Sequence, residues 1–255
     1  MQNYSNVNNV NRVKKKRFRK RKYNGSYSSK VSILSCNAAN IRNKLLSLEK
    51  VVNDLHLSIF CIQETHQVKI GSIKFRGSEN FQIYEKIRMN KGGGGLAIGV
   101  LKEFSPTWMR DGGNEAEALT IKFQVKNFSV RLVNAYAPQE YDNDDKKMHF
   151  WKYFDDEVLN CKNEGSGLIF LFDGNAWLGP SVIKNDPHNQ NKNGELLKSF
   201  LMRNSNLILL NATELCEGVI TRSRKVGEKN ENSVIDFAIV CNKMLPFVSK
   251  GVFTD

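Results

Sequence analysis

Long apolar runs and secretion signals are both missing from this 255-residue chain. No stretch of 18 or more apolar residues occurs, which excludes a membrane-spanning helix, and the N-terminus lacks the apolar segment that begins a secreted protein. Cysteine is scarce, and no C-x-x-C pair is formed by the five present, which are Cys36, Cys61, Cys161, Cys216 and Cys241. This odd, scattered set favours buried thiols in a reducing, intracellular compartment over disulfides or a zinc site.

Acidic residues are absent from the first 30 positions, although the whole chain has 26. The same positions hold 10 of the 38 Lys and Arg residues, including Arg12, Lys14, Lys15, Lys16, Arg17, Arg19, Lys20, Arg21 and Lys22. Such a segment buries too little apolar surface to fold, so we expect residues 1–29 to be a disordered basic tail. The pattern is typical of a nuclear-import signal or a nucleic-acid-binding arm, and it predicts a nuclear protein whose partner is DNA or RNA. A solvated leader without a partner is the alternative.

Strand and helix patterns alternate along the rest of the chain. Strand patterns occur at residues 30–37, 57–62, 81–87, 96–101, 118–125, 128–135, 168–172, 207–210, 219–221 and 233–240, and helical spacing at residues 41–57, 144–159 and 194–204. Several strands follow one another with no helix between them, which indicates mixed sheets with helices outside, an α/β fold in residues 30–255. The 40% hydrophobic content is sufficient for a core.

A nucleotide-cradling loop is also missing. Residues 91–95 carry four glycines, but they neither match G-x-G-x-x-G nor precede Gly-Lys-Ser or Gly-Lys-Thr. The segment therefore favours a mobile hairpin or a substrate-side loop, and no organic cofactor is expected.

Polar side chains follow the most apolar strands. Residues 168–172 form an uninterrupted apolar run that ends on Asp173, Gly174 and Asn175, and residues 57–62 end on Gln63 and Glu64. An acid at the end of a buried strand is costly unless it is solvated, paired or bound to a cation. An ordinary Asp-Gly-Asn turn is one interpretation. A catalytic site along the rim of the sheets is the other.

The order of several short motifs resembles the endonuclease/exonuclease/phosphatase superfamily, and in particular the endonuclease module of non-LTR (LINE-type) retrotransposons. The matching segments are Asn37 with the Arg-Asn-Lys at 42–44, Gln-Glu-Thr at 63–65, the glycine-rich strand at 92–100, Asn-Ala-Tyr-Ala-Pro at 134–138, Asp-Gly-Asn-Ala at 173–176 and Ser-Val-Ile-Asp at 233–236. Each motif is weak alone, and the signal comes from their order. The resemblance implies a four-layered α/β sandwich, with two mixed sheets face to face and helices outside.

The resemblance also implies a metal-dependent phosphodiesterase site, most similar to a DNA-nicking endonuclease. Glu64, assisted by Asn37, would hold Mg²⁺, with Mn²⁺ as the alternative, because hard oxygen ligands suit both ions. Asp173 would orient or deprotonate the attacking water, and Asn175 would hydrogen-bond the phosphate. Tyr136 would donate to a phosphate oxygen or to the leaving group.

Further contacts are implied around the last motif. Phosphate or substrate contacts would come from Thr221, Ser233 and Asn211. Asp236 would orient a catalytic histidine in a terminal Ser-Asp-His motif, but no histidine follows it, and the four histidines of the chain, His56, His66, His149 and His188, all precede it. We therefore expect the domain to lack its C-terminal Asp-His strand, and its activity to be lowered about 10²–10⁴-fold. A catalytically impaired nucleic-acid-binding remnant, and a phosphatase or lipid phosphodiesterase of the same superfamily, are the alternatives.

Overall fold

A computed structural model describes residues 30–88, 93–226 and 229–252. The predicted basic tail, with Lys14 and its neighbours, lies outside these residues, as do Lys91 and Gly92 of the predicted glycine-rich entry. Residues 31–255 form one compact unit. Among the helices in the described residues, none combines the length and apolar character needed to cross a membrane.

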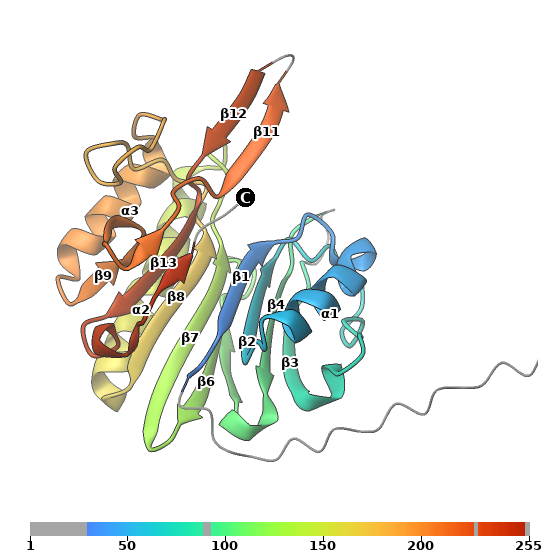
Figure 1. Ribbon diagram of the computed structural model, residues 1–255. Coiled ribbons are helices and arrows are strands. Elements are labelled where there is room, and N and C mark those ends of the chain that lie inside the picture. The colour runs from blue at the N-terminus through green and yellow to red at the C-terminus, as the bar shows by residue number, and fades with distance from the viewer. Residues whose placement is uncertain (1–29, 89–92, 227–228, 253–255) are drawn as a thin grey trace, which may run out of the picture. The chain divides into compact units, whose positions relative to one another are not determined.

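The first of two main sheets has four strands in the order β1-β2-β4-β3 (Figure 1). Its strands are β1 (Ile33–Asn37), β2 (Ile59–Gln63), β3 (Phe81–Lys86) and β4 (Leu96–Leu101). β1 and β2 are parallel and the other pairs are antiparallel, so the sheet is mixed. All five residues of β2 are buried, as the apolar run at residues 57–62 predicts for a central strand.

The second sheet has six strands in the order β5-β6-β7-β8-β13-β9. Its strands are β5 (Thr107–Asp111), β6 (Ala118–Val125), β7 (Phe128–Tyr136), β8 (Gly167–Asp173), β9 (Leu207–Leu209) and β13 (Asp236–Cys241). β7 and β8 are parallel, with Tyr136 opposite Asp173, while β13 runs antiparallel to β8, with Asp236 opposite Asp173. The sheet is therefore also mixed.

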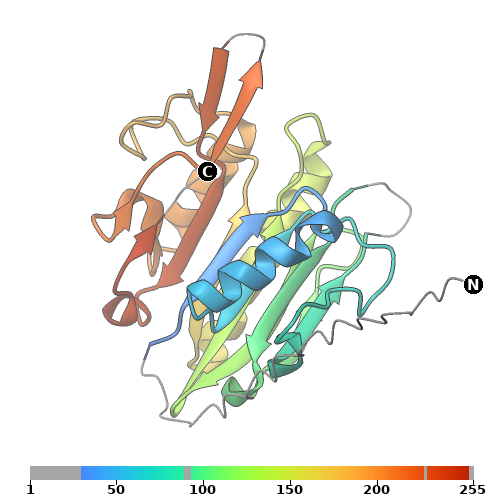
Figure 2. The ribbon, with the colours of Figure 1, turned by 45° about the vertical axis from the view of Figure 1, so that its right-hand side comes forward.

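The helices cover the outer faces of the two sheets (Figure 2). They are α1 (Leu45–Asp54), α2 (Asp144–Glu164) and α3 (Lys192–Arg203). One apolar cluster joins the facing sides of the sheets, a second joins α2 and α3 to the six-stranded sheet, and a third joins α1 to the four-stranded sheet. These four layers confirm the predicted α/β sandwich.

Two short strand pairs and five short 3-10 helices complete the described structure. The pairs are β10 (Cys216–Glu217) with β14 (Gly251–Val252), and the hairpin of β11 (Arg222–Val226) with β12 (Lys229–Ser233). The 3-10 helices span Ile41–Lys44, Ser78–Asn80, Lys102–Phe104, Leu210–Ala212 and Leu245–Phe247. The hairpin formed by β11 and β12 projects from one end of the sandwich (Figure 1).

Two sequence predictions of strands were wrong in this region. The extended piece at 219–221 begins its strand only at Arg222, and the strand predicted at 233–240 is divided. Ser233 ends β12, and the chain turns through Val234 and Ile235 before β13 begins at Asp236. Continuous apolar character cannot distinguish a buried turn from a buried strand, and Val234 and Ile235 are both buried.

Helix α2 is anchored to the sheet by a buried ion pair. The side chain of Arg131 on β7 is 2% exposed and that of Glu157 on α2 is 0% exposed. Arg131 Nη2 and Nε donate to Glu157 Oε2 at 2.8 and 3.0 Å, and Nη1 donates to Glu164 Oε1 at 2.7 Å. Arg110 Nε lies 2.8 Å from the other carboxylate oxygen of Glu157. The pair therefore fixes the helix over β7, the strand that ends with Tyr136.

A polar clip joins the two sheets below the rim that carries the site. Gln63, the last residue of β2, and Asn134 on β7 are both fully buried. Gln63 Nε2 donates to Asn134 Oδ1 at 2.6 Å and to Ser35 Oγ at 3.1 Å. Asn134 Nδ2 donates to two backbone carbonyls of the opposite sheet, at 3.0 and 2.9 Å. These bonds fix the distance between β2, which Glu64 directly follows, and β7, which ends with Tyr136.

Replacing Asn134 with Ala is expected to lower the free energy of unfolding by about 3 kcal/mol, because three buried groups lose their partner at once. Chemical denaturation monitored by circular dichroism measures the effect. Asn189→Ala, at an exposed loop position, is the matched control and is expected to change stability by less than about 0.5 kcal/mol. Equal effects of the two substitutions would contradict a structural role for the clip.

Candidate active site at the rim of the two sheets

Four strands deliver polar side chains to the same rim. β1 and β2 are parallel, and so are β7 and β8, so each pair ends side by side. The ends carry Asn37, Glu64, Tyr136 and Asp173, and the four come together across the gap between the sheets. The strand-end prediction made from the sequence therefore corresponds to a real cluster.

Asn37 connects the two sheets through its side-chain amide. Its Nδ2 donates to Glu64 Oε1 at 2.8 Å and to Asp173 Oδ2 at 2.9 Å. Its Oδ1 accepts from the backbone N–H of Ala39 at 2.9 Å, which sets the orientation of the amide. A single NH₂ group thereby holds two carboxylates, one from each sheet.

Glu64 is half-buried, with 23% of its side chain exposed. Burial raises the pKa of its carboxyl, but hydrogen bonds from Asn37, Tyr136 and His66 outweigh burial and leave the pKa below its ordinary value. His66 Nε2 lies 3.2 Å from Glu64 Oε2. Glu64 is therefore ionised at neutral pH and has an exposed edge available for a cation.

Asp173 is only 2% exposed. Burial raises the pKa of its carboxyl to about 6, against the lowering effects of hydrogen bonds from Asn37 and from the backbone N–H of Asn175. The neighbouring Glu64 carboxylate adds to the rise, and Arg222 opposes it. A carboxyl with a pKa near neutrality suits acid–base chemistry, because it is ionised at pH 7.5 and still a competent proton acceptor.

Tyr136 is 8% exposed and ends β7 beside Asp173. Burial, together with the carboxylates of Glu64 and Asp173, raises the pKa of its phenol well above the ordinary value. Its hydroxyl hydrogen-bonds with Glu64 and Asn175 and accepts from Gln139 Nε2. The phenol thus keeps its proton and can act only as a donor toward an oxygen anion.

Asn175 lies two residues beyond Asp173, in the left-handed region at φ 43°. Its backbone N–H donates to Asp173 Oδ1 at 3.0 Å, and its Nδ2 donates to the carbonyl of Ala137 at 2.8 Å. The side-chain amide therefore has a backbone partner in this structure and ties the end of β8 to the end of β7. Its predicted phosphate contact stays a prediction.

The residues predicted around Asp236 lie on the same side of the second sheet. Thr221 Oγ1 accepts the N–H groups of Ile235 and Asp236 at 3.0 and 3.1 Å, and Asn211 Nδ2 donates to the carbonyl of Asp236 at 2.9 Å. Ser233 accepts the N–H of Thr221 through its backbone carbonyl at 3.0 Å. These contacts hold the start of β13 opposite Asp173. Substrate contacts at these residues stay predictions.

Backbone strain is concentrated at this rim. Of the nine described non-glycine residues with positive φ, five flank the strand ends: Ala39, Asn40, Glu64, His66 and Asn175. Such conformations cost about 1–3 kcal/mol each and persist where the surrounding structure enforces them, which is common at active sites.

Three residues have roles that appear only in the structure. His66 directly follows the Gln-Glu-Thr motif, and this position two residues after Glu64 is the sequence signal that indicates its contact with Glu64. Gln63 belongs to the same motif and forms the clip between the sheets. Arg222 acts on the Asp173 carboxyl from the start of the β11–β12 hairpin, which the strand patterns missed.

The donor set fits a hard divalent cation held by few protein ligands. Mg²⁺ prefers oxygen, keeps several waters and needs one or two side chains. In the described residues, no group of three or more His, Cys, Asp and Glu side chains could hold a metal ion. The Glu64 carboxylate fits as the ligand, while Asn37 orients it and retains one lone pair on Oδ1, since the other accepts from Ala39.

No protein-family model matches the sequence, and no curated protein matches it either. Among solved structures, the endonuclease domain of TRAS1, a telomere-specific non-LTR retrotransposon, matches with a TM-score of 0.62 at 17% identity over 85% of this chain and 88% of that one. The described residues therefore share the fold of that domain.

Two further solved structures show the same fold. An AP endonuclease from Archaeoglobus fulgidus has a TM-score of 0.60 at 16% identity, covering 85% of this chain and 89% of that one. A 3′ phosphatase from Neisseria bound to a product DNA hairpin has a TM-score of 0.63 at 15% identity, with the same coverage. These matches confirm the fold expected from the motif order.

Proposed function

We propose that this chain is a Mg²⁺-dependent phosphodiesterase that nicks DNA, and that it derives from a retroelement endonuclease. The observation that carries the proposal is the Asn37 amide, which holds the carboxylates of Glu64 and Asp173 together beside a protonated Tyr136. The retroelement origin is supported by the Asp-Gly-Asn-Ala and Arg-Asn-Lys segments and by the likeness to the TRAS1 domain.

The ionisation states of three side chains, Asp173, Tyr136 and Glu64, determine their proposed roles in hydrolysis. Asp173 accepts the proton of the attacking water, with its orientation set by Asn37 and by the N–H of Asn175. Tyr136 donates to a phosphate or leaving-group oxygen as negative charge develops there. Glu64 holds the metal, and Mg²⁺, when bound, supplies positive charge that offsets the charge developing on the phosphate.

Basic side chains near the rim favour a polyanionic substrate. Arg222, Arg224 and Lys225 are all exposed on β11. Arg222 is close enough to Asp173 to lower the pKa of its carboxyl. Cations along a projecting hairpin suit contacts with a phosphate backbone. The basic segment at residues 12–22 is proposed to add non-specific DNA affinity and nuclear targeting.

A substrate panel tests the substrate class. Supercoiled plasmid, single-stranded RNA, p-nitrophenyl phosphate and sphingomyelin vesicles are each incubated with the protein and Mg²⁺, and product formation is compared per enzyme. We expect plasmid nicking to exceed turnover of the other substrates. Faster release of phosphate or phosphocholine would favour the phosphatase or lipid-phosphodiesterase alternative, and salt-sensitive DNA binding without cleavage would favour the nucleic-acid-binding remnant.

The raised pKa of Asp173 also predicts a pH dependence of stability. Because the folded-state pKa is about 6 and the ordinary value is 3.8, the folded protein holds a proton that the unfolded chain has released. The contribution of Asp173 to the free energy of unfolding is therefore fully present below pH 4. It is lost as the pH rises to 6, and the loss amounts to about 3 kcal/mol at most. In EDTA, denaturation of wild type and Asp173→Asn across this range should show the loss in wild type only. Parallel profiles would contradict it.

A further inference from the structure

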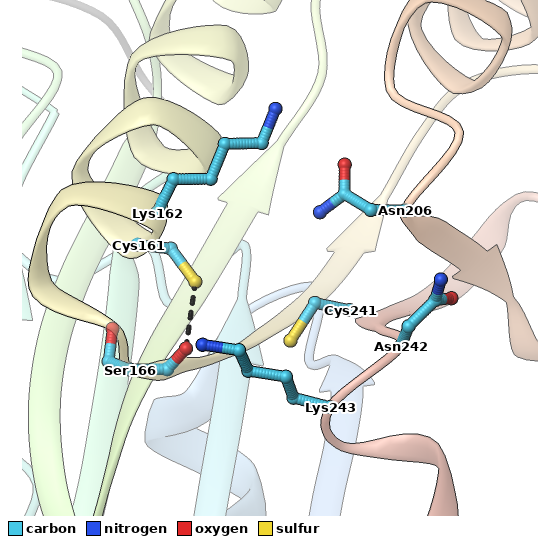
Figure 3. Close-up of a pocket in the computed structure, with 7 residues that line it drawn as sticks. All are labelled: Cys161, Lys162, Ser166, Asn206, Cys241, Asn242 and Lys243. Carbon is cyan, nitrogen blue, oxygen red and sulfur yellow. Dashed lines mark hydrogen bonds between the residues drawn. The ribbon is translucent and has the colours of Figure 1, made fainter.

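A second group of reactive side chains lies at the opposite end of β8 and β13 from the catalytic rim. Cys161 is in the last turn of α2, and Cys241 is the last residue of β13. Both line a pocket of about 240 Å³, together with Lys162 and Lys243. The side chains of Cys161 and Cys241 point into the same space between the end of α2 and the end of β13 (Figure 3). The two thiols are 80 positions apart in sequence, so no spacing motif reveals them.

The two sulfurs have different surroundings. The thiols hydrogen-bond with each other. Cys161 Sγ also lies 3.1 Å from the carbonyl of Ser166, an alternative acceptor for its single S–H proton, and this contact is drawn in Figure 3. Cys241 Sγ accepts the backbone N–H of Leu168 at 3.3 Å, and the N–H groups of Lys243 and Met244 also act on it. Cys241 is thus surrounded by donors, as a sulfur anion requires.

These contacts separate the ionisation of the two thiols. The hydrogen bond from Cys161 lowers the pKa of Cys241 to about 6, with help from the backbone donors and against the effect of burial. The same bond, together with burial, raises the pKa of Cys161 well above its ordinary value. At neutral pH one sulfur is therefore a thiolate and its neighbour a thiol, the combination found in reactive cysteine pairs.

We propose that Cys161 and Cys241 form a peroxide-reactive dithiol site that closes to a disulfide, separate from the catalytic rim. The Cys241 thiolate attacks one oxygen of a hydroperoxide, the O–O bond breaks, and Cys241 sulfenic acid forms as the other oxygen leaves as water or alcohol after taking a proton. The Cys161 sulfur then attacks the sulfenic sulfur, losing its proton as hydroxide leaves, and water is released. Two thiols are oxidised and one peroxide is reduced.

The positions of the two residues determine what the disulfide would do. The bond would link the end of α2 to the end of β13, closing a loop of 80 positions. Cross-linking a loop of this length restricts the unfolded chain, and we expect the melting temperature to rise by about 5 °C. The Lys243 ammonium donates to the carbonyl of Gly165 at 3.3 Å and places positive charge at the pocket, where it acts to lower the pKa of Cys161, against the larger effects that raise it.

Peptide mapping after peroxide treatment tests the proposal. The folded full chain is exposed to hydrogen peroxide at pH 7, remaining thiols are alkylated, and the protein is digested with trypsin without reduction. Cleavage at Lys152, Lys162, Lys229 and Lys243 places the two cysteines in separate peptides, 153–162 and 230–243, each with one cysteine. We expect these peptides joined by a disulfide that dithiothreitol releases. Joining of other cysteine peptides, or five unmodified thiols, would overturn the proposal.

Cysteine substitutions test which of the two thiols reacts first with peroxide. Cys161→Ser should accumulate a sulfenic acid at Cys241 that dimedone traps, whereas Cys241→Ser should leave Cys161 unreacted. Cys216→Ser, which removes a half-buried cysteine that does not line the pocket, should form the disulfide as wild type does. Iodoacetamide labelling of untreated wild type, which requires no substitution, should modify Cys241 before Cys161 at pH 7. Faster labelling of Cys161 would contradict the assignment of Cys241 as the nucleophile.

Discussion

Replacing Asp173 with Asn is expected to lower the rate of Mg²⁺-dependent plasmid nicking by about 10²–10⁴-fold. The amide cannot accept the proton of the attacking water, although it preserves the size of the side chain. The melting temperature at pH 7.5 should stay the same or rise, because the substitution removes the cost of a buried carboxylate with a pKa near 6. Loss of activity without loss of stability is the pattern of a group selected for chemistry.

Asp186→Asn is the matched control for this substitution. Asp186 is also buried, but its carboxylate accepts backbone N–H groups of Gly179 and His188 within a surface loop. We expect that variant to lose stability and to keep its nicking rate within about threefold of wild type. If Asp173→Asn retained full activity, or lost activity only in proportion to unfolding, Asp173 would not be the proton acceptor.

Replacing Arg131 with Met is expected to lower the free energy of unfolding by about 3 kcal/mol, because Glu157 stays buried and charged. The remaining contact from Arg110 keeps the loss toward the lower end of the range for broken buried ion pairs. Urea denaturation measures the change. Arg131→Met combined with Glu157→Leu should recover much of the loss, since an apolar pair of similar volume has no charge to solvate.

Arg203→Met provides the surface comparison. Arg203 pairs with Asp155 at 2.7 Å, and their side chains are 46% and 37% exposed. An exposed pair of this kind contributes less than about 1 kcal/mol. If the two arginine variants were equally stable, the buried pair would not be what anchors α2 to β7.

Apolar runs and strand-end polar residues made much of the site predictable from the sequence. Runs such as residues 168–172 favour buried strands, and where such a strand ends, the next side chain lies at the rim of the sheet. The rim positions of Asp173 and Glu64 follow from this rule, whereas their proposed roles required the order of the motifs. Tyr136 and Asn37 required the order of the motifs, because neither a tyrosine nor an asparagine at a strand end has a distinctive cost.

Contacts between distant segments explain what the sequence could not indicate. The bond from Gln63 to Asn134 depends on how two sheets face each other, and neither residue is unusual within its own strand. The β11–β12 hairpin was missed because its polar, charged strands have no apolar alternation. The contact of Cys161 with Cys241 arises only when α2 packs on the sheet beside β13.

The most direct measurement of the central claim is the rate at which the protein converts supercoiled plasmid to nicked circles, determined for wild type and Glu64→Gln over a range of Mg²⁺ concentrations. We expect wild type to nick in Mg²⁺ and to stop in EDTA. Glu64→Gln should nick at least about 100-fold more slowly at 1 mM Mg²⁺. Equal rates for the two proteins, nicking by wild type in EDTA, or no nicking by wild type at any Mg²⁺ concentration would contradict the account.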